Sequence, residues 1–526
     1  MFDVTIVGCG PVGALAANFL GLAGLKVLVV EKEAVPYPLP RAVHIDHEMM
    51  RLFQASGIVN DIEPDVRDTE GHLHIGADKG VIRYMGTRGK PRPYGWSNDY
   101  FFFQPELEEH LRSALDRFEN VDVRYGHEFL ELSQRDACVD VRLRNDESIY
   151  TQETRWVIAC DGARSTVRKS LGVTLEDLDF EEPWLVVDAE VEGPVRFGNL
   201  TGVPENADLQ NLSVMMCDPE RPATIVPGRG NHRRWEFMLL PGESDEEMQR
   251  PEKVAELLKP WLDGVPHKVT RAATYRFHGL IAEQWQVDNV FLAGDAAHQT
   301  PPFFGQGMCH GFRDVVNLAW KMALVKDGEC KDSLLMTYQP ERDPHVRSVI
   351  SSAVEAGRYI CVLDTAVAAA RDAEIRAKAQ AGALPTPAGN LIPAIIDGVV
   401  ATETSRAGER FIQPRIETEQ GFGLLDNMLP YGWQIFVANE RLATTARQVC
   451  GEYAHQLAIN VTNAASLNDQ GALLRWLDEA GANMVLVRPD FYVFGTADNA
   501  DELIMQLIEK LHFIGDAQSQ AKEKIA

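Results

Sequence analysis

The chain has 526 residues, a formal net charge of −26, 45% hydrophobic residues and 24% charged residues. This length predicts roughly two to four domains with a large buried core, and the composition is ordinary for a globular protein. The strong negative charge argues against nucleic acid and against anionic membrane surfaces as partners.

The eight cysteines are scattered along the chain without a C-x-x-C pair or a zinc-like cluster with histidine. The sequence therefore predicts neither a disulfide framework nor a metal site. The chain starts on an apolar strand without a signal-peptide pattern, and no apolar run approaches the ~20 residues of a membrane helix. We expect a cytoplasmic protein that does not associate with membranes.

The first 31 residues carry a glycine turn between two apolar strands. The run at 4–7 stops at Gly8, Gly10 and Gly13, and a helical segment and a second strand follow. That strand ends in Glu31, 18 residues beyond the last glycine. Backbone N–H groups of such a turn can bind a pyrophosphate, and the acid can bind ribose hydroxyls. A dinucleotide site is therefore favoured over a merely tight strand–helix turn.

A second motif surrounds residue 300. A short apolar strand at 290–293 is followed by Asp295, and a proline pair then leads to a glycine turn at 305–307 and a further helix. The strand delivers an acid to its end, and the N-terminus of the helix can stabilise electron-rich charge on a ligand.

Together these segments resemble the FAD-dependent aromatic hydroxylases, the single-component flavin monooxygenases. Their G-D-A-A-H-x-x-P-P-x-x-G-Q-G pattern is present at 294–307, and a further family segment, C-D-G-A-R-S-T-V-R, is present at 160–168. The resemblance spans nearly the whole chain. Within the family the chain is most similar to the 3-(3-hydroxyphenyl)propionate hydroxylases, through P-R-A-V-H-I-D at 40–46 and W-L-V-V-D at 184–188.

The resemblance implies an α/β fold of three parts. A glutathione-reductase-like FAD-binding Rossmann domain is expected at 1–179 and again at 281–400, where it includes a helical segment. A β-sheet substrate domain is inserted at 180–280, and a thioredoxin-like C-terminal domain follows at 401–526. Because this last domain lacks a C-x-x-C pair, we expect it to serve packing or subunit contact rather than redox chemistry.

The resemblance also assigns the cofactor contacts. Glu31 is expected at the adenosine ribose, Asp295 near the ribityl–pyrophosphate region, Gln104 near the ribityl chain and Arg41 beside the flavin or the nicotinamide donor. The backbone at 307–309 is expected to donate to the flavin C2 carbonyl, although many relatives carry Asn at the position of the cysteine. The full set is Gly8, Gly10, Gly13, Glu31, Arg41, Gln104, Asp161, Asp295, Gly307, Met308 and Cys309.

The implied reaction is hydroxylation of a phenol ortho to its hydroxyl, with NADH or NADPH and O2, through a flavin C4a-hydroperoxide. Pro302 matches the proline beside that peroxide, and its alternative is a rigid loop proline. A base is expected because a phenolate reacts faster than a phenol. Asp46 and His44 are the candidates for this base. The alternative is that both cap the helix that begins near Glu48.

The implied substrate is a phenolic acid of the 3-(3-hydroxyphenyl)propionate or 3-hydroxycinnamate type. Its carboxylate predicts a pocket arginine, for which Arg83, Arg88 and Arg234 are available. Other rings remain open, including resorcinols, substituted phenols, polyketides and drug-like aromatics. A non-hydroxylating flavin oxidoreductase and an FAD-stabilised binding protein also remain open, and a homodimer is suggested by the resemblance alone.

Overall fold

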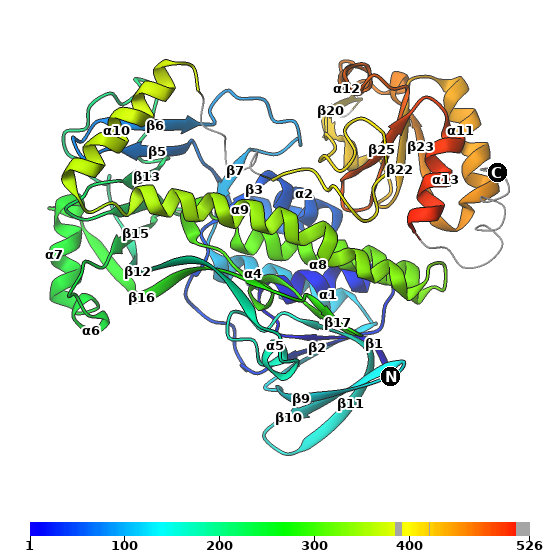
Figure 1. The fold of residues 1–526 in the computed structure, drawn as a ribbon, viewed down its shortest axis with the longest axis horizontal. Coiled ribbons are helices and arrows are strands. Elements are labelled where there is room, and N and C mark those ends of the chain that lie inside the picture. Colours follow the sequence, from blue (N-terminus) through cyan, green and yellow to red (C-terminus); the bar gives the residue numbers. More distant parts are fainter. Residues whose placement is uncertain (384–391, 420, 512–526) are drawn as a thin grey trace.

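The computed structural model describes residues 1–383, 392–419 and 421–511. Figure 1 shows two long helices, α8 (Gly307–Lys326) and α9 (Tyr338–Ile360), crossing the middle of the molecule between its sheets and the C-terminal domain. Within the described residues, no helix combines the length and the apolar character needed to cross a membrane.

The N-terminal sheet is the parallel core of a dinucleotide-binding fold. β1 pairs in parallel with β2 and β11, and the ladder continues in parallel to β8 on one side and β18 on the other. β1, β2, β18 and the end of β11 are apolar runs that are largely buried on both faces, as a parallel sheet covered by helices requires, whereas the edge strand β8 is half-buried. The strands are β1 (Phe2–Val7), β2 (Val27–Glu31), β8 (Val121–Tyr125), β9 (Glu128–Arg135), β10 (Cys138–Arg144), β11 (Ile149–Ala159), β17 (Gln286–Val287) and β18 (Val290–Leu292).

The second sheet has eight strands and is mostly antiparallel. Two of them, β5 and β6, come from residues 71–86, and β12 already begins at Leu175, so the sheet extends beyond the expected 180–280. β5 joins through a parallel pairing with β13, between segments too distant in sequence for a local pattern to reveal. In order the strands are β19 (His298–Gln299), β16 (His267–Ala282), β12 (Leu175–Val191), β15 (His232–Met238), β14 (Ala223–Pro227), β13 (Ser213–Met216), β5 (Gly71–Ile75) and β6 (Val81–Gly86).

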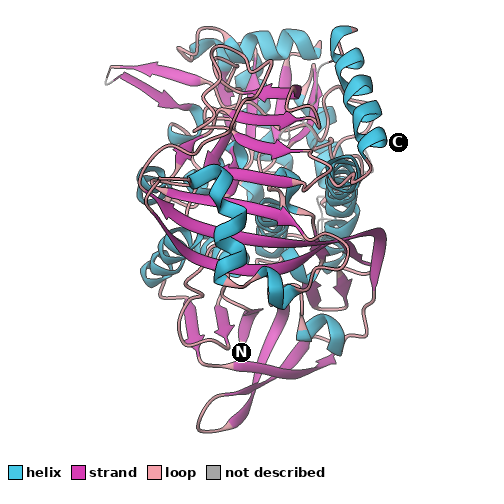
Figure 2. Cartoon of the chain, turned by 90° about the vertical axis from the view of Figure 1, so that its left-hand side faces the viewer, coloured by secondary structure: helices cyan, strands magenta, loops and turns pink. Residues whose placement is uncertain are grey.

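Side chains alternate between the two faces of this second sheet. On β15, Trp235 and Phe237 belong to the outer core, which is covered by α7 (Pro251–Leu262), seen in front of the strands in Figure 2. Arg234, which precedes Trp235, and Glu236, which lies between Trp235 and Phe237, point to the opposite face. That face is turned toward the flavin sheet. The inner face is therefore the one that can meet a cofactor.

The C-terminal domain lies at the upper right of Figure 1 and has a thioredoxin-like fold. β22 pairs in parallel with β23 and antiparallel with β24, which pairs antiparallel with β25. Residues 512–526 of the domain expected at 401–526 lie outside the described residues, as do residues 384–391 of the segment before it. The elements are β22 (Gln434–Val437), α11 (Glu440–Tyr453), β23 (Asn460–Asn463), α12 (Ala472–Ala480), β24 (Met484–Val487), β25 (Val493–Ala497) and α13 (Ala500–Lys510).

A buried polar network joins this domain to the flavin domain. Glu48, in the first turn of α2 (His47–Ala55), accepts a hydrogen bond from the Tyr492 hydroxyl at 3.0 Å and one from Arg313 Nε at 2.8 Å. Arg410 lies 3.6 Å from the same carboxylate. Charges removed from water persist only when they are paired in this way. The C-terminal domain thus contacts the helices that support the cofactor region.

Candidate active site

A cavity of about 840 Å³ lies between the flavin sheet and the inner face of the second sheet. Most residues expected at the cofactor or in catalysis line it. Gly13, Asp46 and Cys309 do not. The expected residues that line the cavity are Gly8, Gly10, Glu31, Arg41, His44, Gln104, Asp161, Asp295, Pro302, Gly307 and Met308.

The glycine turn at the start of α1 (Pro11–Leu22) is shaped for close approach. Gly8 has φ +101°, and a Cβ there would lie 2.4 Å from the Cys160 carbonyl oxygen. A Cβ on Gly13 would lie 2.0 Å from the Gly8 carbonyl oxygen, so Gly13 serves helix–strand packing. Gly10 has no atom within 4 Å of its Cβ position and faces the cavity. This space in front of a helix N-terminus fits a pyrophosphate.

Three carboxylates border the same part of the cavity. Glu31 accepts a hydrogen bond from the Cys9 N–H at 2.8 Å, which holds the end of β2 against the glycine turn. Asp161 accepts from Thr166 and Val167 through one oxygen, while its other oxygen is buried without a partner among the described residues. Burial raises the pKa of Asp295. Unpaired carboxylate oxygens beside a pyrophosphate-sized space fit the hydroxyl-rich ribityl and ribose parts of FAD.

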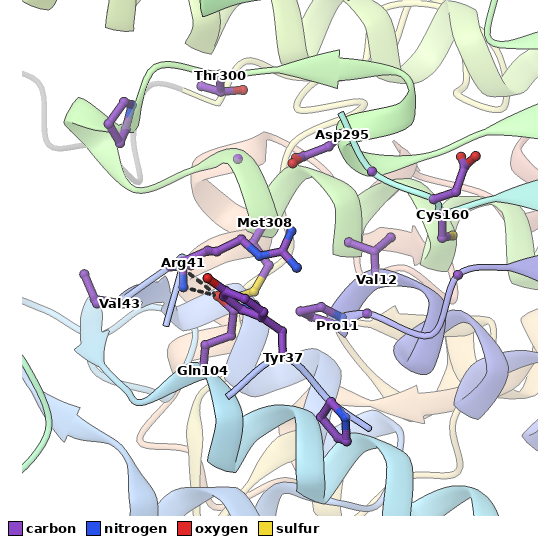
Figure 3. Close-up of a pocket in the computed structure, with 18 of the residues that line it drawn as sticks. Pro11, Val12, Tyr37, Arg41, Val43, Gln104, Cys160, Asp295, Thr300 and Met308 are labelled. Carbon is purple, nitrogen blue, oxygen red and sulfur yellow. Dashed lines mark hydrogen bonds between the residues drawn. The ribbon is translucent and has the colours of Figure 1, made fainter. Parts of the chain in front are cut away.

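Gln104 holds the segment that carries Arg41. Its side-chain oxygen accepts hydrogen bonds from the backbone N–H groups of Arg41 at 2.9 Å and Ala42 at 2.7 Å, and its amide donates to Glu108 at 2.7 Å. The Arg41 guanidinium lies 5.2 Å from the centre of the Tyr37 ring. Figure 3 shows these side chains gathered beside Met308, with Asp295 across the cavity. Gln104 thus holds the backbone at Arg41 and Ala42 in place, and its expected contact with the ribityl chain stays a prediction.

The proline–glycine loop forms the wall nearest the second sheet. Pro302 and Phe303 line the cavity, and Gly305 has φ +62°, where a Cβ would meet His44 Nδ1 at 2.6 Å. Only glycine lets the loop pack on that imidazole. α8 then begins at Gly307, so its free N–H groups face the cavity, whereas the Cys309 side chain is buried away from it with Sγ 3.8 Å from the Gly305 carbonyl oxygen.

His44 and Asp99 form a buried pair at this wall. His44 begins β3 (His44–Asp46), which pairs antiparallel with β7 (Asp99–Phe101), and His44 Nε2 lies 3.0 Å from Asp99 Oδ1. Burial opposes the imidazolium, but the hydrogen bond and charge of Asp99 outweigh it and raise the pKa of His44. Burial lowers the pKa of His72, whose ring centre is 6.0 Å away, to about 4. His44, His72 and Asp99 each offer one atom that could ligate a metal ion, and these three atoms lie within 4.8 Å of one another.

Asp46 occupies the capping position that the sequence left as its alternative. Its Oδ1 accepts from the N–H groups of Glu48 at 2.9 Å and Met49 at 3.3 Å, and its Oδ2 pairs with Arg313 at 2.6 Å. Although burial favours the neutral acid, Arg313 holds the pKa of Asp46 well below its usual range. The capping interpretation of Asp46 is confirmed. Asp46 does not line the cavity, whereas His44, the other candidate for the base, does.

The inner face of the second sheet contributes polar residues that the sequence analysis did not single out. Glu236 lies opposite Thr224 on the neighbouring strand, and both line the cavity with Ser213 and His72. Burial raises the pKa of Glu236 to about 7. The sequence could have indicated Glu236, because an acid stands between Trp235 and Phe237 within a predicted strand and therefore points to the face opposite these two aromatic side chains.

The three arginines proposed for a substrate carboxylate are all engaged. Arg83 lies over the Tyr359 ring and Arg88 pairs with Glu70, and neither lines the cavity. Arg234 lines it, but its guanidinium donates to Asp188 and to two backbone carbonyls at positions 40 and 41. Arg234 therefore fixes the Arg41 segment to the sheet.

The chain is similar to known proteins over most of its length. A family model described as an FAD binding domain matches residues 1–353, and one described as the HcaD C-terminal domain matches residues 408–510. A probable NADH-specific resorcinol 4-hydroxylase of Rhodococcus jostii is 34% identical over 95% of this chain and 93% of its own length. A 3-(3-hydroxy-phenyl)propionate/3-hydroxycinnamic acid hydroxylase of Burkholderia cenocepacia is also 34% identical, over 95% of this chain and 94% of its own.

Solved structures share the fold. The flavin-dependent monooxygenase PieE, in complex with FAD and substrate, superposes with a TM-score of 0.82 at 21% identity, covering 97% of this chain and 99% of its own. The OxyS anhydrotetracycline hydroxylase of Streptomyces rimosus superposes with a TM-score of 0.77 at 24% identity and the same coverage.

Fold, cavity and relatives together define an FAD-dependent aromatic monooxygenase, with FAD as cofactor and NADH or NADPH as reductant. The chain belongs to the FAD-binding-domain family matched over its first 353 residues. The Rossmann flavin domain, the second sheet and the thioredoxin-like C-terminal domain expected from the sequence are confirmed.

Proposed function

We propose that the protein hydroxylates a phenol with a second substituent meta to the hydroxyl, adding the new hydroxyl ortho to the existing one. The observation that carries this proposal is the His44–Asp99 pair packed against the loop at 302–307, between the cofactor region and the second sheet. Bound FAD would take a hydride from NADH or NADPH and deliver one atom of O2 to the ring.

His44 is the proposed base. Asp99 accepts the Nε2–H, which leaves Nδ1 of the neutral imidazole as the proton acceptor. Nδ1 lies beside Gly305 and has no hydrogen-bond partner among the described residues. Nδ1 is closed to solvent against Gly305 in this structure, so the substrate must displace this packing to reach it. A phenol that does so would transfer its proton to Nδ1, and the resulting phenolate would be the more electron-rich ring.

The remaining walls position the reactants. Pro302, Phe303 and Met215 provide apolar surface that excludes water from the reacting ring. The N-terminus of α8 presents Gly307 and Met308 to the cavity, where its dipole favours negative charge on the flavin.

Two meta substituents are supported by the relatives. A phenolic acid of the 3-(3-hydroxyphenyl)propionate or 3-hydroxycinnamate type is the substrate class expected from the sequence, and relatives from Burkholderia carry that name. Resorcinol is the second candidate, supported by the Rhodococcus relative and by the Glu236 carboxyl at the substrate end of the cavity.

Steady-state assays test this function. The purified, FAD-loaded enzyme would be assayed for NADH and NADPH oxidation, O2 uptake and product mass with 3-(3-hydroxyphenyl)propionate, 3-hydroxycinnamate, resorcinol and phenol. We expect the substrate to stimulate NADH or NADPH oxidation. The product should be one oxygen atom heavier and carry its new hydroxyl ortho to the original one, as in a catechol. Oxidation that yields hydrogen peroxide alone, or no stimulation by any of the four, would remove phenol hydroxylation as the function.

A cytoplasmic location and a homodimer also remain proposals. They are supported only by the character of the relatives, and light scattering of the purified protein would measure the oligomeric state directly.

A further inference from the structure

Several residues that line the cavity carry polar atoms without hydrogen-bond partners among the described residues. Thr224 Oγ1 is buried without a hydrogen-bond partner in the described part of the chain, and so are His44 Nδ1 and His72 Nδ1. Glu236 is 8% exposed, and its carboxyl likewise makes no hydrogen bond with the described residues. The Thr224 and histidine atoms are closed to solvent, whereas the Glu236 carboxyl is not among these closed atoms and its residue lines the cavity. Buried polar groups are normally paired, so unpartnered atoms on residues that line one cavity indicate a ligand with complementary groups.

Glu236 and Thr224 are direct cross-strand neighbours on β15 and β14. Cross-strand partners on one face lie about 5 Å apart, so one small substituent can contact both side chains. Val186, on the other neighbouring strand, is apolar and supplies no partner to Glu236. The pair therefore forms one compact polar position in an otherwise apolar part of the wall.

The two arginines nearest Glu236 form their ion pairs and hydrogen bonds with other groups. Arg234 and Arg271 both pair with Asp188 and both donate to the Pro40 carbonyl. Their charges lower the pKa of Glu236, while Asp188 raises it, and burial remains the largest influence. His44 and His72 face the cavity from β3 and β5. Arg234 and Arg271 are thus not free to bind a carboxylate from the substrate.

We propose that Glu236 and Thr224 form the subsite for the meta substituent of the ring, and that this subsite selects a neutral hydrogen-bond donor, such as a second phenolic hydroxyl, over a carboxylate. The inference rests on the proposed function and refines its substrate class. A donor hydroxyl gives its single hydrogen bond to the Glu236 carboxyl and can accept one from the Thr224 hydroxyl. A carboxylate placed there would meet a second carboxyl without a compensating arginine.

Equilibrium binding tests the subsite without requiring turnover. Three meta-substituted phenols would be titrated into the oxidised, FAD-loaded enzyme at pH 8 and followed by the flavin absorbance change: resorcinol, 3-methoxyphenol and 3-(3-hydroxyphenyl)propionate. Resorcinol can donate from its substituent, 3-methoxyphenol can only accept, and the third carries a carboxylate. A hydrogen bond to a charged group corresponds to about a 10-fold preference or more, so we expect resorcinol to bind at least ~10-fold tighter than either of the other two.

The variant Glu236→Gln keeps the size of the side chain and removes its charge. We expect resorcinol to bind ~10-fold more weakly to it, the acid to bind ~10-fold more tightly, and 3-methoxyphenol to change little. The matched control is Glu182→Gln, which removes a half-buried carboxyl on β12 that does not line the cavity. This control should keep the wild-type ranking.

The outcomes separate the two proposals. Equal or tighter binding of the acid by the wild-type enzyme, or parallel changes of all three affinities in Glu236→Gln, would overturn the subsite. If Glu236→Gln fails to retain FAD, the wild-type ranking of resorcinol against 3-methoxyphenol decides alone. If the ligands rank as expected but none yields a hydroxylated product, the subsite stands and the proposed function fails.

Discussion

His44 and Asp99 are the two residues on which the proposed proton transfer depends. The carboxylate raises the pKa of His44, so the base form is populated only as pH rises through a value above the ordinary 6.5. The rate should therefore increase with pH on the acid limb of kcat/KM. For folding the sign is opposite, because the same pair stabilises the folded protein at low pH and loses that contribution as pH rises through the pKa of His44.

Asp99→Asn tests this pair. With the charge removed and burial unopposed, the pKa of His44 should fall, and the acid limb of kcat/KM should move to lower pH. The maximal rate should also fall about 10-fold or more, because the amide can stabilise the wrong tautomer of the imidazole. His44→Gln should remove the limb altogether. An acid limb that stays in place in Asp99→Asn would show that a different group titrates.

The same residues show what a local pattern can and cannot establish. The sequence placed His44 and Asp46 two positions apart and could not choose between them as base. β3 ends at Asp46, which is also the N-cap of α2, so this carboxylate binds the helix N-terminus and Arg313, whereas His44 at the start of β3 lines the cavity. Asp99 and Glu236 were missed because their importance comes from strand pairing, not from a motif.

At the scale of elements, α2, α8 and the C-terminal domain meet in one buried network. Arg313, on α8, donates to Glu48 and Asp46 on one side and to Gln306 at 3.1 Å on the other. Gln306 directly precedes the N-terminus of α8 that faces the cavity. Tyr492 of the C-terminal domain completes the network through Glu48, so the C-terminal domain is linked to the loop at 302–307 that lines the cavity.

Tyr492→Phe tests whether this link positions the loop. The change leaves a buried Glu48 oxygen without its hydrogen bond, which should lower the free energy of unfolding by about 1–3 kcal/mol. A positioning role further predicts a lower rate of flavin reduction by NADH at saturating substrate, with bound FAD retained. Tyr431→Phe, which alters a tyrosine packed on Phe19, is the control. Loss of stability with an unchanged reduction rate would indicate that the contact serves folding alone.

At the scale of the whole molecule, the cofactor region lies where the first sheet, the second sheet and α8 converge. The glycine turn, Glu31 and the loop at 302–307 line one cavity, and we propose that the turn and Glu31 hold the adenosine end of FAD and the loop its flavin end. A ligand that bridges these parts stabilises the folded state, by about 4 kcal/mol at a concentration 1,000-fold above its dissociation constant.

Removal of FAD should accordingly lower the melting temperature, and added FAD should restore it. Riboflavin carries the same ring system without the pyrophosphate and adenosine, so it cannot occupy the glycine turn and should restore little of the loss. Thermal denaturation of the apo protein with each ligand measures the difference. Equal stabilisation by FAD and riboflavin would show that the turn at Gly8–Gly13 does not anchor the cofactor.

The sequence by itself determined the family, the FAD cofactor and the order of the parts, because the motifs that indicate them are short contiguous segments. A glycine turn, the strand that precedes it and the helix that follows it have one backbone geometry wherever they occur. The tertiary structure alone decided which titratable groups meet at the substrate end. His44, His72, Thr224 and Glu236 line one cavity, and Asp99 pairs with His44. These residues come from five strands of two sheets, and only long-range pairing brings them together. Strand register sets which face of a sheet a side chain occupies, and that choice depends on partners distant in sequence.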